Sequence, residues 1–233
     1  MSDEIKIPVF ENFKDKAHIN KDSYEETYKF AEENPEEFWK EIGQRINWIK
    51  PYTKIKDVIW SNKNVDIKWF YDGTLNASYN CIDRHLENKG DQIAIIWEGD
   101  DPNDSLKITY KELHNRVSRF SNMLKNYGVQ KGDRVTIYMP MIPEAAYAML
   151  ACSRIGAVHS VVFGGFSPDS LAGRILDCES KFLITADEGV RGGKKIPLKE
   201  NSDKALEQCP KVKNVFVVKR TGGQINMKEG RDV

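Results

Sequence analysis

Apolar residues along this chain recur with two spacings, one typical of strands and the other typical of helices. Short apolar runs between turn residues predict strands at residues 93–97, 134–139, 157–162, 182–185 and 215–218. Apolar residues three or four positions apart predict helices over residues 76–88 and 198–208, and in the segments that begin at Thr109, Pro143 and Ser167. Because strands and helices alternate, the pattern predicts an α/β fold with a mostly parallel sheet flanked by helices.

Several expected helix ends carry residues that suit them. Thr109 and Glu112 form a capping box, with a hydroxyl at the N-cap and a carboxylate three residues on. Pro143 fits the first turn of a helix, and Gly156 fits the left-handed position that ends it. Residues 134–168 are therefore predicted to form a strand, a helix and a second strand, joined as a right-handed crossover. The carboxyl ends of such parallel strands are a usual place for ligands.

The first third of the chain differs from the rest. Residues 23–30 and 35–45 look helical and carry many charges, and large aromatic side chains recur as far as residue 71. We expect residues 1–75 to be a helical, aromatic-rich lead that packs on a body formed by residues 76–233, and the alternative is an independent binding module. The tail from Thr221 to Val233 contains no clear element and is interpreted as a frayed connection.

Composition narrows the classes of partner. Hydrophobic residues make up 40% of the chain, and Lys plus Arg balance Asp plus Glu at 35 each. A net charge of zero gives no global attraction to nucleic acid or an anionic membrane, and no apolar run approaches the ~20 residues that span a bilayer. Cys81, Cys152, Cys178 and Cys209 form no C-x-x-C pair, so we expect no metal site and no disulfide framework, but buried or partly buried free thiols in the cytoplasm.

Residues 186–196 are predicted to be a loop rich in glycine and basic residues. Arg191-Gly192-Gly193-Lys194-Lys195 follows a predicted strand at its carboxyl end. A planar guanidinium, point charges and glycines that expose backbone N–H groups suit a phosphate, while the plainer interpretation is a solvated basic loop. The neighbouring carboxylates Asp187 and Glu188 are expected to pair with Arg191 or Lys195.

A second glycine motif, Phe163-Gly164-Gly165-Phe166, ends another predicted strand. It has two interpretations. One is a tight turn in which only glycine avoids a Cβ clash, and the other is a turn that lets a ligand approach the backbone. Phosphate capture by this turn alone is not expected, because the chain has no G-x-G-x-x-G or G-x-x-x-x-G-K-[ST] string.

Several strings in the same order resemble one enzyme family. They are IGAVHSVVFGGFSP at residues 155–168, DIKWF at 66–70, DGTLN at 72–76, NCIDRHL at 80–86, ITYKEL at 108–113 and TADEGVRGGK at 185–194. From about Trp39 to its end, the chain is similar to the acetyl-CoA synthetases, the AMP-forming acetate–CoA ligases of the adenylate-forming superfamily. The resemblance implies acetate, ATP and coenzyme A (CoA) as small-molecule ligands, with Mg²⁺, and neither nucleic acid nor a membrane as a partner.

The resemblance also implies roles for both glycine motifs. In the family, the loop that matches Arg191, Gly192, Gly193 and Lys194 contacts the ADP end of CoA, which bears the 3′-phosphate. Lys194 stands where an arginine or lysine is usual, so the charge is kept. The family places the turn that matches Phe163, Gly164 and Gly165 near the CoA site.

Family motifs for the first half-reaction do not appear in the chain. They are the TSGSTG-x-PKG phosphate loop, the acetate pocket, the magnesium ligands and a C-terminal lysine. We therefore expect an incomplete N-terminal portion of the enzyme, without catalytic residues of its own and inactive without the remaining C-terminal part. The alternatives are part of a propionate–CoA ligase, and a non-catalytic nucleotide-binding or interaction module.

Overall fold

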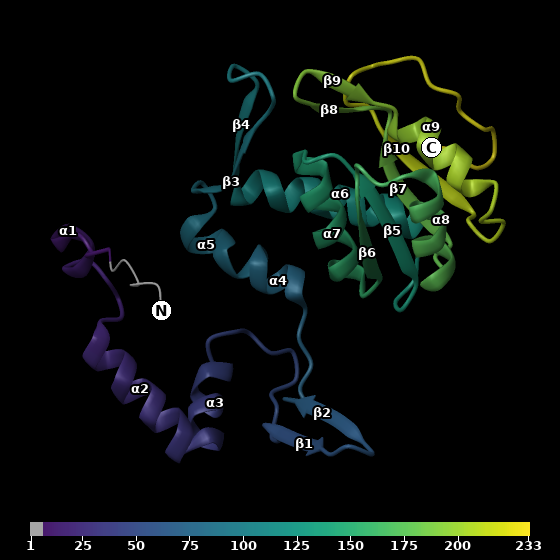
Figure 1. The fold of residues 1–233 in the computed structure, drawn as a ribbon. Helices are drawn as coiled ribbons and strands as arrows, with labels where there is room; N and C mark the ends of the chain where they lie inside the picture. Colours follow the sequence, from purple (N-terminus) through teal and green to yellow (C-terminus); the bar gives the residue numbers. More distant parts are fainter. Residues whose placement is uncertain (1–6) are drawn as a thin grey trace, which may run out of the picture. The chain divides into compact units, whose positions relative to one another are not determined.

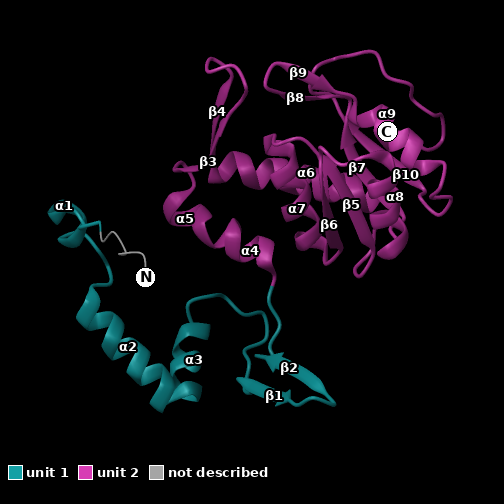
Figure 2. Ribbon diagram, viewed as in Figure 1, with its two compact units in different colours: residues 1–75 teal, residues 76–233 magenta. Residues whose placement is uncertain are grey.

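A computed structural model describes residues 7–233, and its contacts divide the chain into two compact units, Met1–Leu75 and Asn76–Val233 (Figure 2). The first unit contains α1 (Glu11–Lys14), α2 (Lys21–Glu33), α3 (Pro35–Gly43), β1 (Lys56–Trp60) and β2 (Val65–Trp69). Both helices predicted in this region are present as α2 and α3. The antiparallel pair β1–β2 was not expected, because its residues are mostly exposed and carry no buried apolar run.

Aromatic contacts hold the first unit together in place of a buried core. Ring centroids lie 4.9 Å apart for Trp48 and Tyr52, and 4.7 Å apart for Tyr52 and Phe70. The Trp48 indole N–H donates to the Gly43 carbonyl over 2.8 Å. Gly43 is the one buried residue among residues 7–75. A unit that buries so little area gains little stabilising free energy from its own folding. The packing of residues 1–75 on the second unit stays a prediction.

The second unit is built on a parallel sheet of β5 (Arg134–Met139), β6 (Val158–Phe163), β7 (Phe182–Ala186) and β10 (Asn214–Val218), in the order β10-β7-β5-β6 (Figure 1). The crossovers are α7 (Pro143–Ile155), α8 (Pro168–Asp177) and α9 (Leu198–Leu206). The chain moves one way from β5 to β6 and the other way from β6 through β7 to β10. Right-handed crossovers therefore put α7 on one face, and α8 with α9 on the other. This confirms the predicted α/β fold with a parallel sheet flanked by helices.

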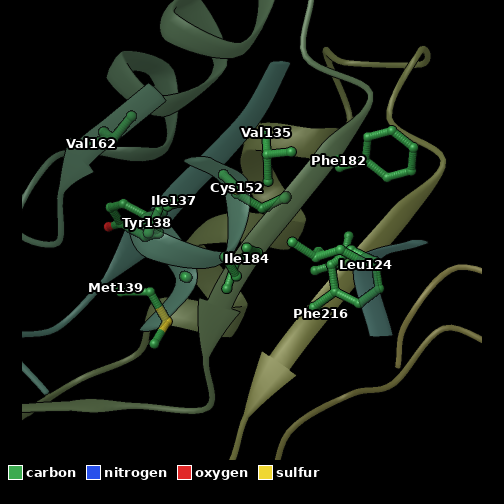
Figure 3. Packing of buried hydrophobic residues seen from close by; sticks show 14 of the residues in the cluster. Leu124, Val135, Ile137, Tyr138, Met139, Cys152, Val162, Phe182, Ile184 and Phe216 are labelled. Atoms are coloured by element: carbon green, nitrogen blue, oxygen red, sulfur yellow. The ribbon is translucent and has the colours of Figure 1, made fainter. Parts of the chain in front are cut away.

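The core lies on both faces of the two central strands, whose side chains are buried from Val135 to Met139 and from Phe182 to Ala186 (Figure 3). The helix α6 (Tyr110–Asn126) packs on α7 and buries Leu113, Val117 and Leu124. The predicted capping box is present, because Thr109 accepts from the Glu112 N–H and Glu112 accepts from the Thr109 N–H.

Two segments of the second unit differ from the elements predicted from the sequence. The single helix predicted over residues 76–88 is three short pieces, α4 (Ala77–Cys81), a 3-10 turn (Asp83–His85) and α5 (Leu86–Lys89). The break coincides with a tertiary contact, since both oxygens of Asp83 accept from the Arg154 guanidinium at 2.8–3.1 Å. The predicted strand β3 (Ile93–Glu98) pairs with an unexpected strand, β4 (Ser105–Thr109).

All four cysteines are free thiols, and Cys81 is exposed, contrary to the expectation for this group. Cys152 and Cys209 are buried and Cys178 is partly buried, as expected. Burial raises the pKa of the Cys152 thiol to about 12, so this side chain acts as a small apolar residue of the core.

The interpretation of the tail as a frayed connection is wrong. The Val215 N–H donates to the Arg231 carbonyl, and the Val217 N–H to the Val233 carbonyl, at 2.9 and 2.8 Å. The tail thus runs along the free side of β10. A buried ion pair also anchors it, because the Lys199 ammonium, whose side chain is 1% exposed, lies 2.9 Å from Asp232.

The buried Asp232 carboxylate makes stability depend on pH. Burial by itself would raise its pKa, but hydrogen bonds from Arg231, the Lys228 N–H and Lys199 outweigh burial and hold the pKa at about 2. The folded pKa lies below the unfolded value of ~3.9, so the stabilisation is complete above pH 4 and is lost toward pH 2. In urea titrations, we expect the stability gap between the native chain and Asp232→Asn to narrow by about 2 kcal/mol from pH 5 to pH 2. A gap that stays constant over this range would contradict the ion pair.

Candidate functional site

Both glycine motifs lie at the carboxyl edge of the parallel sheet. The turn of residues 163–166 begins at the end of β6, and the basic segment follows the end of β7. The crossovers that follow β5 and β7 leave on opposite faces of the sheet. The crevice at the carboxyl ends of these two neighbouring strands is therefore the usual ligand position in open α/β sheets. The fold therefore brings the two motifs singled out in the sequence to one region.

The basic segment is a β-hairpin, not the loop predicted for residues 186–196. The strands β8 (Gly189–Arg191) and β9 (Lys194–Ile196) pair antiparallel, and Gly192 and Gly193 form the two-residue turn at φ values of 58° and 71°. A type I′ hairpin turn needs positive φ at both positions. A Cβ added at either glycine would meet no atom within 4 Å, so a lack of space does not explain these glycines. The positive φ values explain them, because residues with a side chain rarely adopt such a conformation.

The hairpin sets two cations directly across from each other. Arg191 and Lys194 are register partners on either side of the turn, and both are exposed. Directly opposed residues point to the same face of a β-pair, and like charges in that position are destabilising. Within residues 7–233, no carboxylate lies in an ion pair with either one. The turn therefore places two positive charges, neither of them in an ion pair, on one exposed tip beside the Gly193 N–H.

The neighbouring carboxylates have other partners. Glu188 pairs with Lys195 at 2.8 Å, and this hydrogen bond, with a second from the Thr221 hydroxyl, lowers the pKa of Glu188. The predicted pairing is correct for these two residues and wrong for Asp187. The Asp187 side chain instead accepts backbone N–H groups of Arg220 and Gly222 at 2.8 Å, and so fixes the loop after β10 beside the hairpin.

The turn after β6 is tight for steric reasons. A Cβ on Gly164 would lie 2.9 Å from the Met139 carbonyl oxygen, and a Cβ on Gly165 would lie 2.6 Å from the Phe163 ring. The backbone contact supports the structural interpretation at Gly164, whereas the contact at Gly165 is with an exposed side chain. The Phe163 ring packs edge-on against Phe166 with centroids 5.9 Å apart, and its side chain stays 54% exposed.

Arg191 and Phe163 contact each other. The Arg191 guanidinium lies over the Phe163 ring, 5.7 Å from its centroid, in a cation–π geometry. This contact joins the end of β6 to the hairpin that follows β7, although β5 lies between β6 and β7 in the sheet. The result is an exposed surface made of an aromatic ring, two cations and a glycine turn.

Sequence reasoning predicted a polar loop over residues 98–105 but missed the contacts of its acidic residues at the tip of β3–β4. The Asp100 carboxylate accepts the Gly193 N–H over 2.9 Å. Asp104 pairs with Arg220 at 2.6 Å, and that guanidinium also lies 5.0 Å from the Trp97 ring centroid. No local pattern could have predicted these contacts, because they join residues about 90 to 115 positions apart.

A cavity of about 530 Å³ lies elsewhere, between the ends of α6 and α7, and shares no lining residue with this surface. Its cations are Lys125, Lys131 and Arg154, and Arg154 is already paired with Asp83. Lysines near helix carboxyl ends suit the negative end of the helix dipole, so this cavity has a sufficient structural explanation.

The described residues, 7–233, contain no cluster of three or more His, Cys, Asp or Glu side chains arranged to hold a metal ion. Over the same residues, no helix is long and apolar enough to cross a bilayer.

Comparison with known families identifies the second unit. The family model described as AMP-binding enzyme matches residues 82–231, more than half of the chain. The chain belongs to the AMP-binding enzyme family. A second model, described as acetyl-coenzyme A synthetase N-terminus, matches residues 24–81 and therefore covers most of the first unit.

Curated relatives of this AMP-binding enzyme agree with both matches. An acetyl-coenzyme A synthetase from Parvibaculum lavamentivorans is 66% identical over 233 residues, which are 100% of this chain and 36% of the relative. One from Mesorhizobium japonicum is 62% identical over 95% of this chain and 34% of the relative. The chain thus spans about a third of the length of these relatives.

A solved structure, the acetoacetyl-CoA synthetase from Streptomyces lividans, is similar in fold. Its TM-score is 0.78 at 23% identity, over 88% of this chain and 31% of that protein. This likeness supports the fold class alone.

Proposed function

We propose that this chain forms part of the CoA-binding surface of an AMP-forming acetate–CoA ligase, and that the β8–β9 turn recognises the 3′-phosphate of CoA. The observation that carries the proposal is the pair of opposed cations, Arg191 and Lys194, without carboxylate partners in the described chain. Opposed cations repel each other, so an anion bound between them removes a cost that the free protein carries.

Each residue of the surface has a distinct task in this proposal. Arg191 offers a planar fork to two phosphate oxygens, and Lys194 adds a point charge. The N–H groups of the Gly192-Gly193 turn supply further donors. Phe163 offers an exposed aromatic ring next to Arg191, suited to a nucleobase, and Gly164 and Gly165 form the tight turn that positions this ring at the sheet edge.

The reaction proposed for the whole enzyme joins acetate to CoA in two steps. Acetate attacks the α-phosphate of ATP and releases pyrophosphate, and the CoA thiol then takes the acetyl group from acetyl-adenylate and releases AMP. We assign no catalytic residue of this chain to either step, and the binding of acetate, ATP and Mg²⁺ is proposed only for the whole enzyme, with its remaining C-terminal part. The four free thiols fit a reducing compartment, and we propose the cytoplasm.

Titration of the chain with adenosine 3′,5′-bisphosphate, followed by amide NMR, tests the role of the turn. The expected result is a set of shifts at the Gly192, Gly193 and Lys194 amides, which adenosine 5′-monophosphate does not produce at equal concentration. A charge-assisted phosphate contact is worth roughly 1.5–3 kcal/mol, and exposure of the turn favours the lower half, about tenfold in affinity. Equal responses to the two nucleotides would support the plainer interpretation, a solvated basic hairpin.

A further inference from the structure

The Gly193 N–H already has an anionic partner within the protein. Asp100, at the tip of the β3–β4 hairpin, places one carboxylate oxygen 2.9 Å from this nitrogen. If the turn binds a phosphate as proposed above, that phosphate and Asp100 compete for the same donor. The inference that follows rests on that proposed function.

The Asp100 contact belongs to an ordered loop. The Gly99 N–H donates to the Asp104 carbonyl over 2.7 Å, and the Asp101 side chain accepts the Asn103 N–H over 2.9 Å, so the loop is closed by its own hydrogen bonds. Asp104 is paired with Arg220 at 2.6 Å. The loop is therefore attached to the body at a point separate from Asp100.

A second attachment lies at the end of β3. The Trp97 indole N–H donates to the Met141 carbonyl over 2.7 Å, next to the carboxyl end of β5. The Arg220 guanidinium packs over the same indole ring. These contacts involve neither Gly193 nor Asp100, so the Asp100 side chain can leave the turn while the loop stays attached.

We propose that Asp100 is an internal anion that occupies the phosphate-binding turn in the free protein and is displaced when the ligand phosphate binds. Its charge, held at the turn by the Gly193 N–H, partly offsets the repulsion between Arg191 and Lys194, neither of which forms an ion pair with a carboxylate among residues 7–233. A ligand must replace that interaction and also overcome repulsion from the carboxylate. Asp100 thereby lowers affinity for all anions, and favours ligands that make additional contacts, such as a nucleobase on Phe163.

The direct test compares Asp100→Ala with Asp101→Asn, a matched control that removes the same charge from the same loop without touching Gly193. Calorimetry with adenosine 3′,5′-bisphosphate is expected to show three- to tenfold tighter binding to Asp100→Ala than to the native chain, and a change below about twofold for Asp101→Asn. Inorganic phosphate, which has no base to contact Phe163, is expected to gain at least as much from Asp100→Ala.

A second measurement checks the contact without any ligand. Hydrogen exchange at the Gly193 amide is expected to be at least several-fold faster in Asp100→Ala than in the native chain, and unchanged in Asp101→Asn. This readout also verifies that both variants keep the hairpin folded, because the register bonds of β8 and β9 are measured in the same spectrum.

The outcomes separate this inference from the proposed function. One outcome is that Arg191→Ala weakens binding of the bisphosphate, while Asp100→Ala binds it no tighter than Asp101→Asn does. The proposal that Asp100 is an internal anion is then wrong, and the proposed phosphate site stands. Weaker binding to Asp100→Ala would also overturn it, because Asp100 would then support the bound state. If the native chain does not bind the bisphosphate, or Arg191→Ala leaves its affinity unchanged, the proposed function fails and this inference fails with it.

Discussion

The Lys199→Met variant is expected to lose about 3 kcal/mol of stability, the largest effect of any single substitution considered. The Lys199 ammonium lies 2.8 Å from both oxygens of Asp203, 2.9 Å from Asp232 and 2.7 Å from the Asn226 carbonyl. Its removal leaves the fully buried Asp232 side chain with one cation fewer. Breaking a buried ion pair from one side typically costs roughly 3–5 kcal/mol, and Arg231, which remains bonded to both carboxylates, keeps the cost at the lower end.

Amide hydrogen exchange in the central strands β5 and β7 measures this loss, because it reports the unfolding of the second unit separately from the first. Lys204→Met is the matched control on the same helix. Lys204 pairs with Glu200 four residues earlier, at side-chain exposures of 57% and 62%, so its loss is expected to cost at most about 0.5 kcal/mol. Equal costs for the two variants would mean that the buried network does not anchor the tail.

The second large effect concerns the proposed ligand. In a chimera of residues 1–233 with the rest of the Parvibaculum lavamentivorans relative, which is 66% identical, Arg191→Ala with Lys194→Ala should raise the KM for CoA by roughly 30- to 100-fold. Both cations act on the same phosphate, so their joint removal costs more than either alone. Acetate-dependent ATP–pyrophosphate exchange should stay within about twofold, because it precedes CoA binding.

Lys195→Ala in the same chimera controls for the loss of surface charge. Lys195 is one residue from Lys194 but is paired with Glu188, so its charge is largely neutralised. We expect less than a threefold change in the KM for CoA. A collapse of exchange in the double variant would assign the hairpin to the ATP half-reaction or to folding.

The parts of the fold that were predictable are those that local chemistry determines. The apolar runs of β5 and β7 are buried on both faces, so the hydrophobic pattern alone indicated them. The side chains of Thr109 and Glu112 bond to each other and to each other's backbone N–H, so the capping box was predictable without tertiary structure. Both glycine motifs were identified because each follows a predicted apolar strand.

The unpredicted parts depend on pairing between exposed segments. The strands β1, β2, β4, β8 and β9 have few buried side chains, so no apolar run marked them. The Gly192-Gly193 pair was a turn signal that could have predicted the β8–β9 hairpin. Asp100, 93 residues from Gly193, and the tail contacts of Lys199 left no local signal, because only the folded chain brings these residues together.

The most direct test of the central claim is the ratio of kcat/KM for CoA to that for dephospho-CoA, which lacks only the 3′-phosphate. If Arg191 binds that phosphate, the ratio measured with the native chimera should fall by about tenfold in Arg191→Ala, while the kcat/KM for dephospho-CoA stays nearly unchanged. The claim is contradicted if the ratio in Arg191→Ala equals the native ratio, whatever happens to the overall rate.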